Sequence, residues 1–291
     1  MRKILMTLAA VLCCAMTVFA QSDRNRTYRI TLNNVQYAHH DEKMSAGNAV
    51  GNILSGVLTG QTSVQATEYE DDVKNAIIKG LSGAYRFRYN DGLLQLDDVV
   101  EDGNLVVDAI ITNIKANSSS RTWKDKNDKT QVSTTYTGVA EVMLTLKDAK
   151  SGEIVANPSF NGQGTVSSSF STSDKAIQDA LNRLSNRITV WLNNYRPLRA
   201  NILEGTAAKK DKQKEVYIDL GSNEGAFVGL HMGVYEVKTI AGREAKSQIG
   251  KLKIEAVEGD DISRCKVQSG GKDIKAAFDA GQQLQVISID K

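Results

Sequence analysis

The sequence predicts an α+β protein, in which an antiparallel or mixed sheet with helices packed on one face is followed by a small all-β, barrel-like domain. Two amphipathic helical patterns alternate with strand patterns between residues 28 and 195, which is typical of helices that cover a sheet. Residues 216–291 instead hold five short strand patterns separated by glycine turns. Short strands at this spacing favour a small closed barrel.

The chain opens with a secretory leader. The stretch MRKILMTLAAVLCCAMTVFAQ begins with the basic Arg2 and Lys3, continues as an apolar run and closes on small residues. We therefore expect residues 1–20 to be a signal peptide that is cleaved after Ala20. The apolar run is short for a bilayer, which needs ~20 residues, and this disfavours a membrane anchor.

The three cysteines limit covalent attachment. Cys13 and Cys14 follow Val11-Leu12 rather than the small residue that lipoprotein processing needs, which disfavours lipidation. After cleavage only Cys265 remains, so an internal disulfide is excluded and packed cores must stabilise the mature chain. Cys265 lies in an alternating apolar run and is expected to fill a small buried space.

The charge balance argues against a nucleic-acid partner. Of the 36 basic residues, two leave with the leader, so 34 basic residues face 34 acidic ones in the mature chain. A nucleic-acid-binding surface predicts a clear basic excess. We expect a protein that is exported and works outside the cytoplasm, soluble or in peripheral contact with a membrane.

Residues 21–198 are expected to form the α+β domain. The run YRITLNNVQY from Tyr28 alternates as a half-buried strand does, and residues 104–117 read as a buried strand. Apolar side chains recur at helical spacing in residues 69–85 and 173–195, so both segments are predicted helices, the second with Ser173 as its cap.

Several connections in this domain are predicted from turn residues. Asp91-Gly92 favours a tight hairpin turn, and Gly152 is expected in the turn between two long strands. Ser118 to Lys129 reads as a polar loop. Met44 to Gln65, rich in glycine, is either a loosely packed helix or a flexible arm that contacts partners or a membrane surface.

Residues 199–215 have the charge run and small residues of a linker, and residues 216–291 form the second domain. The stretch LGSNEGAFVGLHMGVY in that domain has glycines at every fourth position. It lacks the lysine and spacing of a phosphate-binding loop and is too polar for a membrane packing motif. Gly221, Gly225 and Gly229 are therefore predicted turn residues between strands.

Both domains resemble known families of bacterial envelope proteins. The strand Val106 to Ile110, the strand–turn pair Val142 to Asp148 with Ser151 to Val155, and the closing amphipathic helix resemble CsgG-like and TolB N-terminal-like domains. The run LGSNEGAFVGLHMGVYEV, then IGKLKI and a final strand, resembles the C-terminal barrel of the flagellar assembly protein FlgT. The resemblance implies a non-catalytic envelope component of a Gram-negative bacterium that binds other proteins.

No chemical constellation points to catalysis, a cofactor or a metal. His39-His40-Asp41-Glu42 places adjacent histidines on opposite faces of a strand, which makes joint ligation of a metal difficult. Neither a nucleophile–base pair nor a nucleophile elbow can be assembled, which disfavours a periplasmic hydrolase.

From the sequence we expect a non-enzymatic protein of the periplasm or outer membrane, acting as an assembly or adaptor component through contacts with other envelope proteins. A homo-oligomer is a second arrangement that the sequence permits. The alternative is an oligomeric, CsgG-like secretion channel subunit that inserts part of Met44 to Gln65 or of the Ser118 to Lys129 segment into a membrane.

Overall fold

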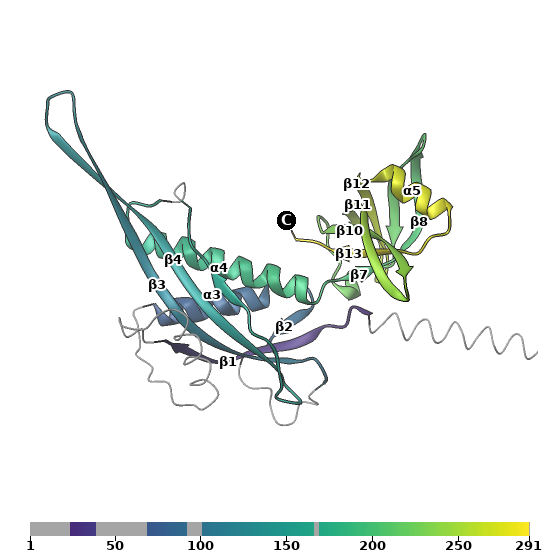
Figure 1. Cartoon of the computed structure of the whole chain (residues 1–291), viewed down its shortest axis with the longest axis horizontal. Helices are drawn as coiled ribbons and strands as arrows, with labels where there is room; N and C mark the ends of the chain where they lie inside the picture. Colours follow the sequence, from purple (N-terminus) through teal and green to yellow (C-terminus); the bar gives the residue numbers. More distant parts are fainter. Residues whose placement is uncertain (1–23, 39–68, 92–100, 166–168, 291) are drawn as a thin grey trace, which may run out of the picture. The chain divides into compact units, whose positions relative to one another are not determined.

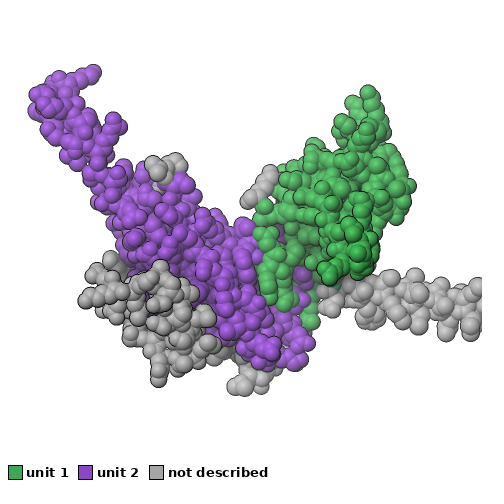
Figure 2. All heavy atoms as spheres, in the orientation of Figure 1, with its two compact units in different colours: residues 1–27, 192–291 green, residues 28–191 purple. Residues whose placement is uncertain are grey.

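The structure is a computed structural model that describes residues 24–38, 69–91, 101–165 and 169–290. Several features that the sequence analysis names lie outside the described residues: the predicted leader at residues 1–20, the His39–Glu42 cluster, the segment from Met44 to Gln65, and Gly92. The chain divides into two compact units: unit 1 comprises residues 1–27 and 192–291, and unit 2 comprises residues 28–191 (Figure 2).

Figure 1 labels the helices and strands. Unit 2 holds β1 (Tyr28–Tyr37), α3 (Glu70–Ser82), β2 (Phe87–Tyr89), β3 (Leu105–Lys124), β4 (Thr130–Asp148), β5 (Ile154–Ala156), β6 (Ser159–Asn161) and most of α4 (Ser173–Tyr195), whose last residues belong to unit 1. The rest of unit 1 holds β7 (Arg199–Ala200), β8 (Ile202–Lys209), β9 (Lys212–Ile218), the 3-10 helix η2 (Ser222–Glu224), β10 (His231–Ile240), β11 (Arg243–Val257), β12 (Ser263–Ser269), α5 (Gly271–Asp279) and β13 (Leu284–Ser288).

Unit 2 contains a mixed sheet with the order β2-β1-β3-β4-β5, in which β6 also pairs with β4. Strand β1 pairs in parallel with β2 and β3, whereas β3 and β4 are antiparallel. β1 has the bounds that its alternating pattern predicts. The buried strand expected at residues 104–117 is the first half of β3, whose side chains are buried from Leu105 to Ile111 with the exception of the half-buried Val106.

The two helices of unit 2 pack closely on the sheet and on each other. Helix α4 lies close to the backbone of β4 at Gly138 and to the segment after β6 at Gly162. The approach is so close that a Cβ at either glycine would collide with a carbonyl of α4. Helix α3 contacts α4 at Gly80, whose carbonyl accepts a 2.8 Å hydrogen bond from Thr189. Side chains that are fully buried in this core include Ile30, Ile77, Leu81, Leu105, Ile111, Leu144, Leu146, Leu184 and Ile188.

Helix α4 begins and ends as the sequence predicts, but its cap is different. The N–H of Lys175 donates a 3.4 Å hydrogen bond to Oγ1 of Thr172, whereas Oγ of Ser173 contacts its neighbour Asp174. Thr172, one residue earlier than expected, therefore supplies the side-chain oxygen at this helix start.

The sequence predicts a polar loop from Ser118 to Lys129, but only residues 125–129 form a turn, and the residues before them are strand. Strand β3 continues to Lys124 and remains paired with β4 as far as Lys124 opposite Thr130. Both faces of this part of the hairpin are exposed. Its side chains therefore lack the apolar alternation that reveals a strand whose one face is buried.

Unit 1 contains an antiparallel sheet with the order β7-β13-β10-β11-β12-β9-β8. Strands β7 and β8 stand at the two ends of this order, yet only Asn201 separates them along the chain. The end of β9 and strands β10 to β13 supply the five strands expected in residues 216–291. The described part of the unit also includes helix α5, so the expectation that this domain is all-β is wrong. Its buried side chains include Leu198, Val216, Ile218, Leu220, Met232, Val234, Leu252, Ile254, Cys265 and Val286.

The prediction of a linker at residues 199–215 is also wrong, because these residues form β7, β8 and the start of β9. The lysines that give the segment its linker-like composition lie on or beside an edge hairpin, which turns at Lys210 with a φ of 59°. Exposed lysines are common on edge strands because they hinder pairing with other chains. None of the described helices is both long and apolar enough to cross a bilayer.

Candidate functional site

The four glycines predicted at turns lie in two separate places. Gly152 has a φ of 74° in the turn between β4 and β5, while Gly225 and Gly229 have φ values of 89° and 100° between β9 and β10. Gly221 has a φ of −127°, which other residues also adopt. It is constrained by space instead, because a Cβ would collide with the backbone of Asp260 and Asp261.

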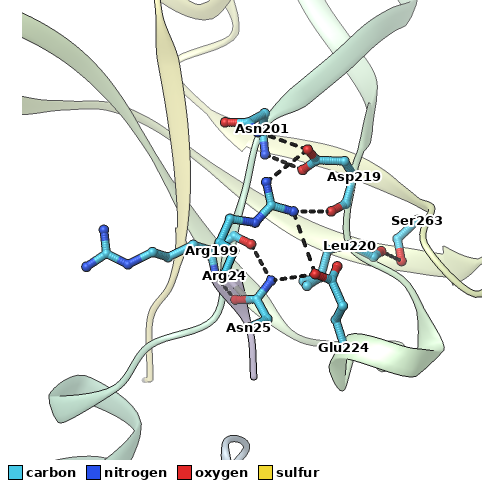
Figure 3. A network of polar contacts seen from close by, with 8 residues as sticks. All are labelled: Arg24, Asn25, Arg199, Asn201, Asp219, Leu220, Glu224 and Ser263. Atoms are coloured by element: carbon cyan, nitrogen blue, oxygen red, sulfur yellow. Dashed lines mark hydrogen bonds and ion pairs between the residues drawn. The ribbon is translucent and has the colours of Figure 1, made fainter. Parts of the chain in front are cut away.

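The turn that contains Gly221 and Gly225 contacts Arg24 and Asn25, the first residues that the structure describes. The guanidinium of Arg24 forms a 2.9 Å ion pair with the carboxylate of Asp219 and donates a 2.6 Å hydrogen bond to its backbone carbonyl. Asn25 donates to the carbonyl of Arg199 at 2.7 Å and accepts from its N–H at 2.8 Å. We call this network, shown in Figure 3, the N-terminal clasp.

Two acidic residues of the clasp have different surroundings. Asp219 is 6% exposed and accepts hydrogen bonds from the backbone N–H and the side-chain amide of Asn201 in addition to those from Arg24. Glu224 accepts a 3.2 Å hydrogen bond from Asn25, and Arg24 is 3.8 Å from its carboxylate. Burial nevertheless raises the pKa of Glu224, because desolvation outweighs the opposing effect of the Arg24 charge.

Cys265, the one cysteine after residue 14, is buried, as the sequence predicts. Cys265 lies on β12 with its side chain out of contact with solvent. Burial raises its pKa to about 12, and the carboxylate of Glu255 acts in the same direction. At neutral pH the thiol is protonated and inaccessible, so it is an unreactive core residue rather than a nucleophile.

Unit 2 carries a different kind of candidate site. The β3–β4 hairpin continues well beyond the rest of the sheet, and Figures 1 and 2 show it as a narrow projection of unit 2. We call residues 118–136 the distal ribbon. Its side chains from Ser118 to Ser133 are exposed with the exception of Asp125, and two apolar ones are among them: Trp123 is 45% exposed and Val132 is 62% exposed.

The tip of the distal ribbon is an ordered turn rather than a featureless loop. The carboxylate of Asp125 accepts hydrogen bonds from the N–H groups of Lys129 and Asn127 and from the side chain of Gln131. These bonds, led by that from Lys129, lower the pKa of Asp125. Lys124 and Asp128 form an exposed ion pair of 2.7 Å across the same turn.

One face of the distal ribbon holds a groove. It has a volume of about 460 Å³ and is lined by Ser119, Arg121, Trp123, Ser133 and Thr135. The antiparallel register places Arg121 opposite Ser133 and Trp123 opposite Gln131 on this face, and Thr122 opposite Val132 on the other. The groove thus combines an aromatic surface, a cation and hydroxyl groups, which can bind a partner that offers both apolar and acidic groups.

The sequence analysis missed both the clasp and the ribbon. Arg24 and Asn25 lie in a short polar stretch of the sequence that resembles any other solvent-exposed segment. The ribbon has a usable signal in TQVSTTYT, residues 130–137, where β-branched and aromatic residues dominate. In residues 24–38, 69–91, 101–165 and 169–290 the structure brings together no group of three or more potential metal-ligating side chains.

Comparisons with known proteins identify no family for this chain. No family model matches the sequence, and no curated protein matches it. Among solved structures, a protein described as a homologue of the neuraminyllactose-binding hemagglutinin from Helicobacter pylori is 8% identical, with a TM-score of 0.28. That match covers 58% of this chain and 83% of the other.

Two further matches are of the same kind. A protein of family DUF330 from Xanthomonas campestris is 11% identical with a TM-score of 0.29 and covers 57% of this chain and 91% of its own. A lipoprotein from Neisseria meningitidis is 12% identical with a TM-score of 0.21 and covers 57% of this chain and 99% of its own. Similarities at this level carry no argument about function.

Proposed function

We propose that this protein is exported to the cell envelope and acts there, without catalysis, as an assembly or adaptor component that contacts another envelope protein through the distal ribbon. The observation that carries the proposal is the exposure of Trp123 and Val132 on a projecting β-hairpin. A large aromatic side chain next to an arginine, in a groove, is the composition that dominates the binding energy of many protein interfaces.

The rest of the molecule supports a binding role. Cys265, the remaining nucleophile of highest intrinsic reactivity, is buried with its pKa raised to about 12. The glycines between β9 and β10 serve turn conformation and close packing. The leader at residues 1–20 supports export, and the resemblance to CsgG-like and FlgT-like domains supports an envelope location.

An oligomeric channel subunit is the second candidate, and the distal ribbon is the observation that favours it, because a projecting hairpin could join a barrel of hairpins. The side chains of the ribbon argue against membrane insertion. A membrane-spanning strand needs ~9–11 residues with one apolar face. From Ser118 to Lys124 and Thr130 to Tyr136 only Trp123, Val132 and Tyr136 are apolar, and they do not share one face.

Site-specific photo-crosslinking in intact cells tests the adaptor function. A photoreactive amino acid replaces Ser133, which lines the groove, in the full chain with its own leader, and adducts are identified by mass spectrometry. We expect one exported protein to dominate. The matched control places the same amino acid at Lys74, an exposed position on α3. Adducts no more abundant or uniform than those at position 74 would count against the proposal.

A further inference from the structure

The outer edge of β4 is paired with the protein's own chain until it reaches the distal ribbon. Gly162 donates to the carbonyl of Ala140 at 2.7 Å, and Gly164 donates to that of Gly138 at 3.1 Å. Tyr136 and Phe170 exchange two hydrogen bonds of 2.8 and 2.9 Å in an antiparallel bridge. Gly162, Gly164 and Phe170 thus occupy this edge as far as Tyr136.

Beyond Tyr136 the edge continues without a neighbour among the described residues. The residues of β4 whose backbone groups point outward alternate along the strand: Ala140, Gly138 and Tyr136 are paired. The uninterrupted register with β3 continues this alternation to Thr134, Val132 and Thr130. The N–H and C=O groups of those three residues therefore point away from β3, in line with the occupied part of the edge.

This part of the edge lacks the features that usually prevent strands from pairing with other chains. Residues 130–135, TQVSTT, contain no charge, proline or glycine and are rich in β-branched side chains. The opposite edge, along β3, carries Arg121 and Lys124. The β4 edge is therefore the better template for an additional strand.

The charges around the edge indicate what kind of strand it would accept. Residues 118–136 contain four basic and two acidic side chains. Asp125 is engaged by the N–H groups of the turn, and Asp128 is paired with Lys124. In the described chain Arg121, Lys126 and Lys129 have no carboxylate within ion-pairing distance. A second copy of the ribbon would bring the same positive charges, whereas an acidic segment would complement them.

We propose that the outer edge of β4 at Thr130–Thr135 accepts an extended, acidic segment of a partner protein as an added antiparallel strand. This inference rests on the proposed adaptor function and specifies its partner. Hydrogen bonds to the outward backbone groups of Thr130, Val132 and Thr134 supply affinity. Alternate side chains of the added strand supply specificity, with acidic ones toward Arg121 in the groove and apolar ones toward Val132 on the other face.

The test uses the mature chain, residues 21–291, and a fluorescently labelled decapeptide of alternating Glu and Val, with binding followed by anisotropy at low salt. We expect saturable binding that a decapeptide of alternating Lys and Val does not show. N-methylation of alternate backbone amides in the Glu–Val peptide removes its donors and should abolish binding. Hydrogen exchange should slow at residues 130–136 and not at residues 117–124.

Two proline variants form the matched pair. Val132 and Thr122 lie opposite each other, so the N–H of Val132 points to the outer edge of β4 and that of Thr122 to the outer edge of β3. Val132→Pro should weaken binding about tenfold, the effect of losing one or two net hydrogen bonds. Thr122→Pro should leave it unchanged. Exchange at residues 117–124 reports whether the hairpin stays paired in each variant.

Charge reversal provides an independent readout if either proline frays the ribbon. The double variant Arg121→Glu and Lys129→Glu should bind the Glu–Val peptide about tenfold more weakly than the wild type. Lys74→Glu, on α3, should have no effect. The inference is overturned if Val132→Pro leaves the affinity for the Glu–Val peptide unchanged while the ribbon stays paired. It is also overturned if the double charge reversal leaves that affinity unchanged.

The remaining outcomes are equally decisive. Concentration-dependent dimers that Val132→Pro dissolves, without peptide binding, would assign this edge to a second copy and contradict an acidic partner. If photo-crosslinking at position 133 captures one exported protein while the peptide fails to bind, the adaptor function stands and the added acidic strand is wrong. If both experiments fail, the adaptor function falls as well.

Discussion

Arg24 and Asp219 are 195 residues apart in the sequence, and one guanidinium contacts both the carboxylate and the backbone carbonyl of that aspartate. The carboxylate is almost fully buried, so loss of Arg24 leaves a negative charge with only the amide groups of Asn201 as partners. This contact joins the first described residues of the chain to the sheet of unit 1.

Arg24→Ala should therefore lower the free energy of unfolding of unit 1 by about 2 kcal/mol, the scale of a hydrogen-bonded charge that loses its partner. Urea denaturation followed by hydrogen exchange in β9 and β10 reads unit 1 separately from unit 2. Lys124→Ala is the control, because its ion pair with Asp128 is exposed and should contribute well under about 1 kcal/mol. Equal effects of the two substitutions would contradict the importance of the clasp.

Glu224 should give the stability of unit 1 a measurable pH dependence. Its folded pKa is raised above 4.5, chiefly by burial, so the folded chain binds this proton more tightly than the unfolded chain. The resulting stabilisation is present below about pH 4.5 and is lost as the pH rises through the folded pKa. Glu224→Gln should be more stable than the wild type at pH 7, with the difference shrinking toward pH 4. A difference that grows on acidification would contradict this cause.

The turn glycines should respond to alanine in two different ways. Gly221→Ala places a methyl group against the backbone of Asp260 and Asp261 and should cost about 2 kcal/mol of unfolding free energy. Gly229→Ala meets open space and is opposed only by its φ of 100°, so it should cost about 1 kcal/mol. Urea midpoints of the two variants, measured side by side, check the order.

The distal ribbon should not enter lipid. Insertion would bury the hydroxyl groups of both faces where lipid offers them no hydrogen-bond partner. The fluorescence of Trp123, obtained as the difference between the wild type and Trp123→Phe, should keep its emission maximum when vesicles of phosphatidylethanolamine and phosphatidylglycerol are added. A blue shift together with leakage of a trapped dye would instead support the channel candidate.

The elements that bury apolar side chains could be predicted from the sequence, and those that stay exposed could not. Helix α4 has the bounds that its pattern indicates, because a buried stripe imposes a period of 3.6 on the side chains. Strand β1 also has its predicted bounds, although Ile30, Thr31 and Leu32 are buried in succession. The outer half of β3 and the hairpin of β8 and β9 expose both faces or lie at an edge. Their polar composition therefore resembles a loop or a linker, although backbone pairing makes them strands.

The candidate sites were harder to predict than the core. The role of Gly225 as a residue with positive φ follows from the turn-rich stretch around it. The pairing of Arg24 with Asp219, by contrast, depends on which residues the fold brings together across most of the chain, and no local pattern encodes such a contact. The role of Trp123 as a binding residue likewise depends on its exposure, and an isolated tryptophan in a sequence is more often buried.

If the chain is exported, as we propose, the clasp has a consequence for the order in which the chain can mature. Unit 1 is built from the first described residues and the last hundred, so the 164 residues of unit 2 are inserted within it. If translocation proceeds from the N-terminus, Arg24 and Asn25 emerge early and must wait for Asp219 and Arg199. Contacts of such high sequence separation form slowly because a long loop has to close first. The closing of the clasp would then be a late event, because it has to wait until Arg199 and Asp219 have crossed the membrane.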